Sequence, residues 1–170
     1  MKKILIILSI ILTIIIMNKE YDKIIIPNDA IRIRVIANSN KLEDQLLKLK
    51  VKENITNHLY KKLENVNTLE EARVNIKNNL DNVDKIVSTT LNSNNYKIHY
   101  GNNYFPDKEL NGIEYQEGRY ESLVINIGSA EGNNWWCVLF PPLCMVEGTY
   151  NDSNKIEYKS KILEILNRYK

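Results

Sequence analysis

Both tryptophans and both cysteines of the chain fall within ten residues, in the segment Asn134-Trp-Trp-Cys-Val-Leu-Phe-Pro-Pro-Leu-Cys144. Cys137 and Cys144 are seven positions apart, and a disulfide between them would close a small loop around Pro141 and Pro142. Proline locks φ and favours such a turn, and closing the loop contributes about 2 kcal/mol through chain entropy. Two buried free thiols are the alternative. Zinc would lack ligands without a nearby histidine, and the spacing is not the Cys-x-x-Cys of a redox pair, so we expect no metal or cofactor.

The two tryptophans follow one another in a short apolar run that favours a strand. Neighbouring side chains on a strand point to opposite faces, so either Trp135 or Trp136 is expected in the core, with the other exposed. An exposed tryptophan is a common anchor of protein interfaces. The alternative is that both rings pack inside.

Arg32 and Arg34 alternate with apolar residues and therefore share one face of a predicted strand. They can pair with Glu43, Asp44 or Glu121, or bind a carboxylate of a partner through the bidentate guanidinium fork. A solvated strand face is the plainer interpretation.

Candidate catalytic residues are few, because the chain has two histidines and two cysteines. Ser39 lies in Asn-Ser-Asn and not in Gly-x-Ser-x-Gly, and neither a His-Glu-x-x-His motif nor a glycine-rich phosphate loop occurs. We therefore expect no catalytic site. A hydrolase that uses Cys137 with His99 or a carboxylate is the enzyme alternative.

The residues above must be positioned by a small set of elements. Alternating apolar and polar residues favour strands at residues 31–36, 96–100, 122–127 and 135–140. Apolar residues spaced by three and four predict helices over residues 41–62, 69–91 and 154–169. This order predicts an α+β fold, with a mostly antiparallel sheet of about four strands packed against three helices.

Polar residues before each helix fit the expected caps. Asn40 with Glu43, and Thr68 with Glu71, have the spacing of capping boxes. Asn154 would cap the last helix, whose inward-facing residues are expected to be Ile156, Leu163 and Leu166.

An apolar leader precedes these elements. Residues 4–17 are 14 uncharged positions after Lys2 and Lys3, about 21 Å as a helix against a bilayer core of roughly 30 Å. This length fits a signal peptide better than a full membrane span, although no small-x-small cleavage site follows, so a signal anchor is the alternative. We expect residues 1–20 to be this leader, 21–30 a linker and 31–170 a single domain outside the cytoplasm.

The charge balance excludes bulk electrostatic binding. The 170 residues include 23 Lys and Arg against 21 Asp and Glu, a net charge of +2 for which the two leader lysines account. This gives no basis for binding nucleic acid, and membrane contact is expected only through the leader.

Two segments resemble one known family. Residues 31–40 (IRIRVIANSN), followed by Glu43-Asp-Gln45 and Leu49-Lys-Val51, resemble the opening of the stage II sporulation protein R family. The Trp-Trp-Cys segment resembles the family's C-terminal signature, and residues 118–128 fit the approach to it. The resemblance spans about residues 31–146. The family often has aspartate where Asn40 stands.

The resemblance implies an exported signalling protein and not an enzyme. Such proteins are made in the forespore of endospore-forming bacteria and activate a membrane-bound aspartic peptidase across the space between two membranes. That peptidase then removes the pro-sequence of sigma-E in the mother cell. We expect the contact to involve Arg32, Arg34, Asn38, Glu43, Asp44, Trp135 and Trp136, held by the Cys137–Cys144 disulfide. The alternatives are an extracytoplasmic hydrolase acting on cell wall or peptide, and a purely structural anchored domain.

Overall fold

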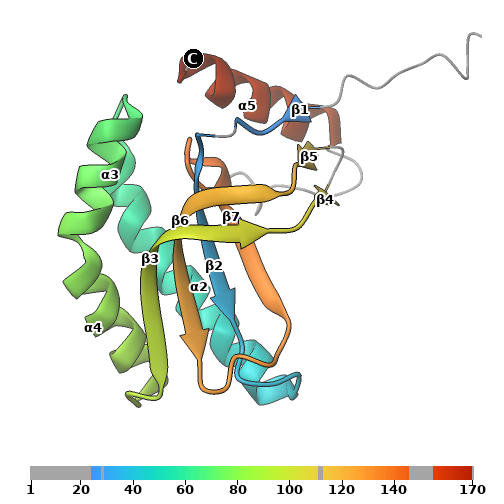
Figure 1. The fold of residues 1–170 in the computed structure, drawn as a ribbon. Coiled ribbons are helices and arrows are strands. Elements are labelled where there is room, and N and C mark those ends of the chain that lie inside the picture. Colours follow the sequence, from blue (N-terminus) through green and yellow to red (C-terminus); the bar gives the residue numbers. More distant parts are fainter. Residues whose placement is uncertain (1–23, 28, 111–112, 146–154, 170) are drawn as a thin grey trace, which may run out of the picture.

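The computed structural model describes residues 24–27, 29–110, 113–145 and 155–169. Its centre is a four-stranded sheet in the order β3-β6-β2-β7 (Figure 1), formed by β2 (Ile31–Ile36), β3 (Tyr96–Phe105), β6 (Gly118–Ile127) and β7 (Asn134–Phe140). β2 pairs antiparallel with β7 and parallel with β6, and β3 pairs antiparallel with β6. The predicted α+β fold is confirmed. The parallel pair at the centre of the sheet is a feature that the strand pattern does not predict.

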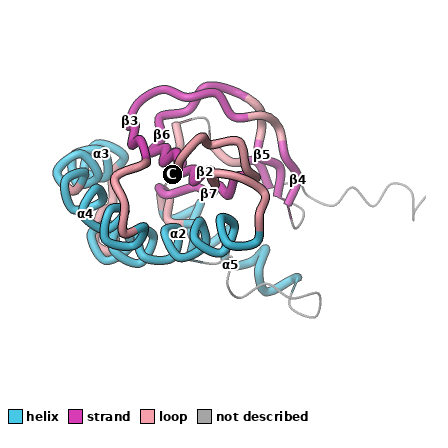
Figure 2. The backbone as a smooth tube through the Cα atoms, turned by 90° about the horizontal axis from the view of Figure 1, so that it is seen from below, coloured by secondary structure: helices cyan, strands magenta, loops and turns pink. Residues whose placement is uncertain are grey.

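Three helices cover one face of this sheet (Figure 2). They are α2 (Leu42–Leu63), α3 (Leu69–Asn78) and α4 (Leu80–Leu91). The predicted single helix over residues 69–91 is wrong, because the chain leaves helical geometry at Asn79, where φ is −105° and ψ is 4°. The Asn79 side chain donates to the Asn75 carbonyl at 2.8 Å, which satisfies backbone that the break would leave open.

The two capping predictions have different outcomes. Thr68 caps α3 as predicted, since its hydroxyl accepts from the Glu71 amide at 3.2 Å. Asn40 does not cap α2, which begins after Lys41 without a side-chain cap. The Asn40 amide oxygen instead accepts from the Asn133 backbone amide at 2.7 Å, because the loop between β6 and β7 lies beside it.

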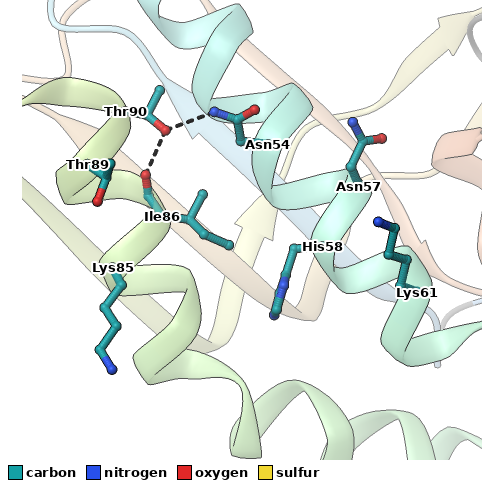
Figure 3. Close-up of a pocket in the computed structure, with 8 residues that line it drawn as sticks. All are labelled: Asn54, Asn57, His58, Lys61, Lys85, Ile86, Thr89 and Thr90. Carbon is teal, nitrogen blue, oxygen red and sulfur yellow. Dashed lines mark hydrogen bonds between the residues drawn. The ribbon is translucent and has the colours of Figure 1, made fainter.

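An open groove of about 490 Å³ runs between α2 and α4 (Figure 3). Asn54 of α2 donates to Thr90 of α4 at 2.9 Å and joins its two sides. His58 lines this groove, and its Nε2 lies 3.2 Å from Asn79 Oδ1, a structural partner. The lining residues are Asn54, Asn57, His58, Lys61, Lys85, Ile86, Thr89 and Thr90.

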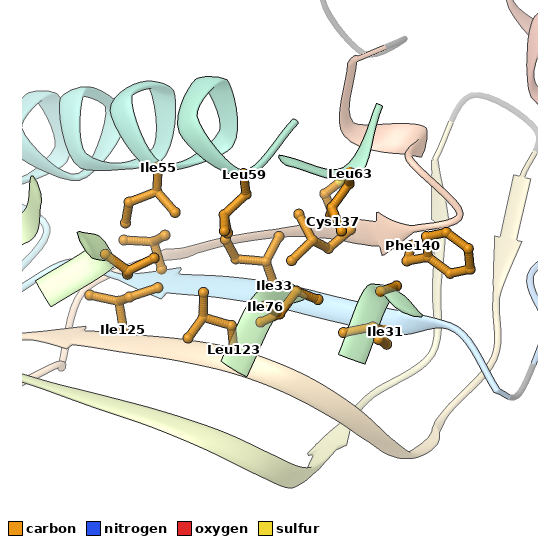
Figure 4. Close-up of a cluster of buried hydrophobic side chains, with 14 of the residues drawn as sticks. Ile31, Ile33, Ile55, Leu59, Leu63, Ile76, Leu123, Ile125, Cys137 and Phe140 are labelled. Carbon is orange, nitrogen blue, oxygen red and sulfur yellow. The ribbon is translucent and has the colours of Figure 1, made fainter. Parts of the chain in front are cut away.

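The main core lies between the sheet and these helices (Figure 4). From β2, Ile31, Ile33 and Val35 are fully buried and face α2, as the alternation predicts. α2 contributes Ile55 and Leu59, each with no exposed surface. Burying a side chain of this size contributes about 1.5–3 kcal/mol, so this layer fixes which face of β2 carries the arginines.

A second layer covers part of the opposite face. A small sheet in the order β1-β5-β4, formed by β1 (Ile24–Ile25), β5 (Ile113–Tyr115) and β4 (Lys108–Leu110), contributes to it together with α5 (Lys155–Arg168) and the short 3₁₀ turn η1 (Leu143–Met145). Ile26 is fully buried in this layer, so the segment expected to be a linker is packed from β1 onward.

The last helix is only partly as expected. Leu166 faces inward, but Leu163 is 45% exposed and Ile162 is buried in its place. The expected leader, the Asn154 cap and the Ile156 side chain lie outside the described residues. Among the helices that the structure describes, none is long and apolar enough to cross a bilayer.

Candidate functional site

Arg32 is fully buried on the face of the sheet opposite the three main helices. Its guanidinium carbon lies 3.4 Å from the ring centre of Tyr120, and further rings surround it at 5.2 to 6.0 Å, from Phe105, Trp136 and Tyr115. One Nη donates weakly to the Gln116 carbonyl at 3.4 Å, while Nε and the other Nη have no hydrogen-bond partner. Desolvation lowers the pKa of Arg32. The predicted solvated strand face is therefore wrong for this residue, because aromatic rings from four other strands enclose it.

Arg34 lies at the border of the same aromatic layer and is half-buried. Its guanidinium carbon is 4.0 Å from the centre of the Phe105 ring, and one Nη donates to the Tyr104 carbonyl at 2.8 Å. Burial lowers the pKa of Arg34. Of the two arginines, only Arg34 has exposed surface that a partner can reach.

The expected ion pairs of these arginines with acidic residues do not form. Glu121 instead binds Arg73, with Nη2 at 2.8 Å, and accepts from the Tyr100 hydroxyl at 2.7 Å. Burial acts to raise the pKa of Glu121, but the hydrogen bonds from Arg73 and Tyr100 outweigh it and lower this pKa. Partial burial and the same carboxylate raise the pKa of Tyr100.

Asn38 and Asp44 come together where β2 leads into α2. Asn38 Nδ2 donates to Asp44 Oδ2 at 2.9 Å, and Ser39 Oγ donates to the same oxygen at 2.6 Å. The hydrogen bond from Ser39, followed by that from Asn38, lowers the pKa of Asp44. This carboxylate also lies in the first turn of α2, where the helix dipole favours negative charge. Asp44 thus fastens the loop to the helix and does not pair with an arginine.

The loop between β6 and β7 packs on this network. The Ser129 amide donates to Asn38 Oδ1 at 3.0 Å, and the Ser129 hydroxyl donates to the Asn38 carbonyl at 2.9 Å. Gly128 has φ of +57°, and a Cβ there would overlap Asn38 Oδ1. A Cβ on Gly132 would overlap the Ser39 carbonyl oxygen. Both glycines are therefore required by close approach of the two loops.

We call residues 38–49 and 128–135 the loop-end surface. Its polar network includes residues that the sequence patterns do not single out, such as Gln45, Lys48 and Ser129. Lys48 is buried, and its Nζ donates to Gln45 Oε1 at 2.7 Å and to the Asn133 carbonyl at 3.2 Å. The sequence feature that indicates such a network is the Asn-Ser-Asn triplet, because these side chains readily hydrogen-bond to nearby backbone and carboxylates.

The two tryptophans lie on opposite faces, as the strand alternation predicts. Trp136 is 7% exposed and packs in the second layer, edge-on to Phe105 and Tyr115. Trp135 is half-buried on the helix side, with Lys52 Nζ 4.7 Å from its ring centre. Trp135 is thus the ring that reaches the surface.

No disulfide joins the two cysteines in the structure, so the expected Cys137–Cys144 bond is not formed in it. Cys144 Sγ donates to the Val138 carbonyl at 2.9 Å, and Cys137 Sγ lies 3.7 Å from the same oxygen. This shared acceptor satisfies both thiols without a bond between them. Cys137 is buried and Cys144 is half-buried.

The residues of the hydrolase alternative are not brought together. His99 lies on β3 and Cys137 on β7, the two edge strands of the main sheet. Three strand spacings separate them, about 14 Å at 4.8 Å each. Among the described residues, no group of three or more His, Cys, Asp or Glu could hold a metal ion.

The seven residues expected to bind a partner therefore form two groups. Asn38, Asp44, the exposed Glu43 and the half-buried Trp135 belong to the loop-end surface. Arg32, Arg34 and Trp136 belong to the opposite face of the sheet, where two of the three are buried.

Comparison with known proteins identifies the family. The family model of stage II sporulation protein R matches residues 27–150. The protein of Bacillus subtilis (strain 168) named "Stage II sporulation protein R" is 31% identical over 140 residues, which cover 80% of this chain and 62% of that relative's length. No solved structure matches. The matched region contains both the arginine strand and the Trp-Trp-Cys strand, and the chain belongs to the stage II sporulation protein R family.

Proposed function

We propose that this sporulation protein is a signal exported from the forespore into the space between the two membranes, or held there by its leader. It activates a membrane-bound aspartic peptidase, which then processes pro-sigma-E in the mother cell. The observation that carries the proposal is membership of the family over residues 27–150. Because the chain spans 62% of its Bacillus subtilis relative, the activity of that whole protein comes to this chain only as part of the proposal.

The arrangement of the two family segments supports a binding role. The Asn-Ser-Asn triplet and the Trp-Trp-Cys strand are about 95 residues apart in sequence, yet β2 and β7 pair directly and Asn40 binds the amide of Asn133. They therefore form one end of one sheet. The polar side chains there bind mainly backbone and each other, which suits a rigid recognition surface better than a reaction centre.

Activation requires that the signal bind the active state of the peptidase more tightly than the inactive state. Shifting a receptor from about 1% to about 99% active takes a preference of about 10⁴-fold. A surface that is fixed before binding loses little conformational entropy on docking, so more of the contact energy remains for this preference. The hydrogen bonds between the two loops provide such rigidity.

Reconstitution tests the proposal. The chain is exported in cells that contain the peptidase and pro-sigma-E but lack the resident signal, and processing is followed by immunoblot. We expect processing with the wild-type chain and its loss with Arg34→Ala or Trp135→Ala. The matched control is His99→Ala, an exposed position on the far edge strand, which should process normally.

Two further measurements separate binding from folding. Protein level and thermal unfolding of each exported variant show whether the fold is kept, and Trp135→Phe should restore part of the activity because a ring remains. Normal processing in both alanine variants would refute the site. No processing with the folded wild-type chain would refute the function.

A further inference from the structure

An apolar stripe on the outer face of α2 is left uncovered by the fold. Leu42 is 73% exposed, Leu46 is 50% exposed and Leu49 is 46% exposed. Their spacing of four and then three residues places them on one line along the helix. α2 belongs to the layer of helices on one side of the sheet (Figure 2), and its opposite face is buried against the sheet through Val51 and Ile55.

Charged residues beside this stripe indicate the kind of surface to which it is complementary. Glu43 and Lys50 are both exposed, seven positions apart, so they lie on the same flank of the leucines. Among the described residues, neither has an ion-pair partner in its own chain. They are placed almost symmetrically about the middle of the stripe and carry opposite charges. Such a surface is complementary to itself when two copies run antiparallel.

We propose that the α2 stripe is the contact between two copies of this chain, related by a two-fold axis between Leu46 and Leu49. In that register Leu46 of each copy packs on Leu49 of the other, as apolar residues spaced by three and four do between paired helices. The same flanks then face each other, and Glu43 of one copy lies beside Lys50 of the other.

The end of the stripe is complementary in the same register. The next position along the line is Glu53, which is exposed. In the antiparallel pair it lies opposite the first residue of the other copy's α2. The partial positive charge at a helix N-terminus favours a carboxylate there. The symmetric contact thus places Leu46 and Leu49 against each other at its centre and a carboxylate beside a helix N-terminus at each end.

The contact is small, so the association is expected to be weak and dependent on concentration. Sedimentation velocity of the full chain in non-ionic detergent, from on the order of 10 µM to 1 mM, covers the range expected for such interfaces. We expect the wild-type chain to shift from monomer to dimer. Leu46→Lys should remain a monomer, since it places a charge at the centre of the contact.

Charge reversal distinguishes a second copy from any other occupant. Glu43→Lys alone and Lys50→Glu alone each place like charges together in the symmetric pair and should reduce dimerisation at least tenfold. The double variant Glu43→Lys/Lys50→Glu restores opposite charges and should recover it. Lys62→Glu, at an exposed site in the last turn of α2, is the matched control and should dimerise like the wild type.

The outcomes that overturn the proposal are equally definite. A wild-type chain that is monomeric at every concentration excludes the second copy. Dimers unaffected by Leu46→Lys and by both single reversals place the contact elsewhere. Loss of the dimer in the single variants without recovery in the double variant means that the charges do not face each other. No peptidase is present in this assay, so its result is independent of the proposed function.

Discussion

Replacing Arg32 with methionine tests how a charge can be buried without an acidic partner. Arg32 has no exposed surface, and two of its nitrogen groups lack acceptors. Each unsatisfied buried donor costs about 1–3 kcal/mol, or about 2–6 kcal/mol for the pair. This cost is removed when a side chain of similar length without charge takes its place.

The stabilisation of Arg32 by the surrounding aromatic rings is similar in size to this cost. The ring of Tyr120 at 3.4 Å is desolvated and contributes about 2 kcal/mol, and the three more distant rings contribute about 0.5 kcal/mol each. The two sides nearly cancel. We therefore expect Arg32→Met to unfold with a free energy within about 1 kcal/mol of the wild type, as with other buried charges replaced by apolar side chains. Arg32→Ala also relieves the donors but leaves a cavity, and should be about 2–5 kcal/mol less stable than the methionine variant.

Urea unfolding followed by circular dichroism measures these free energies. The matched control is Arg119→Met, an exposed arginine on β6, which should change stability by less than about 0.5 kcal/mol. If Arg32→Met is destabilised as much as Arg32→Ala, the buried charge is itself a net stabiliser. The reasoning from unsatisfied donors would then be wrong.

Three further predictions follow from other parts of the fold. Gly132→Ala should lower stability by about 1–3 kcal/mol in thermal unfolding, because its Cβ would overlap the backbone carbonyl of the loop before α2. Glu121→Gln should cost about 1.5–3 kcal/mol at neutral pH through the weakened contact with Arg73. The pKa of Glu121 is lowered in the folded state, so the wild type has this stability in full above the unfolded-state pKa and loses it as pH falls through the folded-state pKa. The free energies of unfolding of the wild type and the glutamine variant should therefore converge in acid. Half-buried Cys144 should react with iodoacetamide in the native protein and Cys137 only after unfolding, as peptide mass spectrometry would show; equal rates would contradict their burial.

The elements of this fold follow from local patterns, and their pairing does not. The alternation at residues 31–36 identifies β2 and the face that carries its arginines, because burial of Ile33 and its neighbours is encoded at a spacing of two. The parallel contact of β2 with β6 depends on residues 90 positions away. The break at Asn79 escapes the periodicity because apolar residues continue at helical spacing on both sides of it.

The candidate site shows the same division. Asn38 and Asp44 are close in sequence, and their contact follows from the turn between a strand and a helix. The burial of Arg32 depends on rings supplied by β3, β5, β6 and β7, which no local pattern reports. The exposure of Leu42, Leu46 and Leu49 could not be predicted either, because their spacing of four and three is the one expected of core residues.

The position of β2 in the sheet also governs when this chain can fold. Its two neighbours end at residues 127 and 140, so the second strand in sequence waits for the last two strands of the main sheet. Contacts between such distant residues slow folding, because the long loop must close before they form. A chain that is delivered from its N-terminus can pair β2 with β6 only after residue 127 emerges, and it can complete the main sheet only after residue 140. The main sheet is therefore incomplete for most of the time that such a chain takes to emerge.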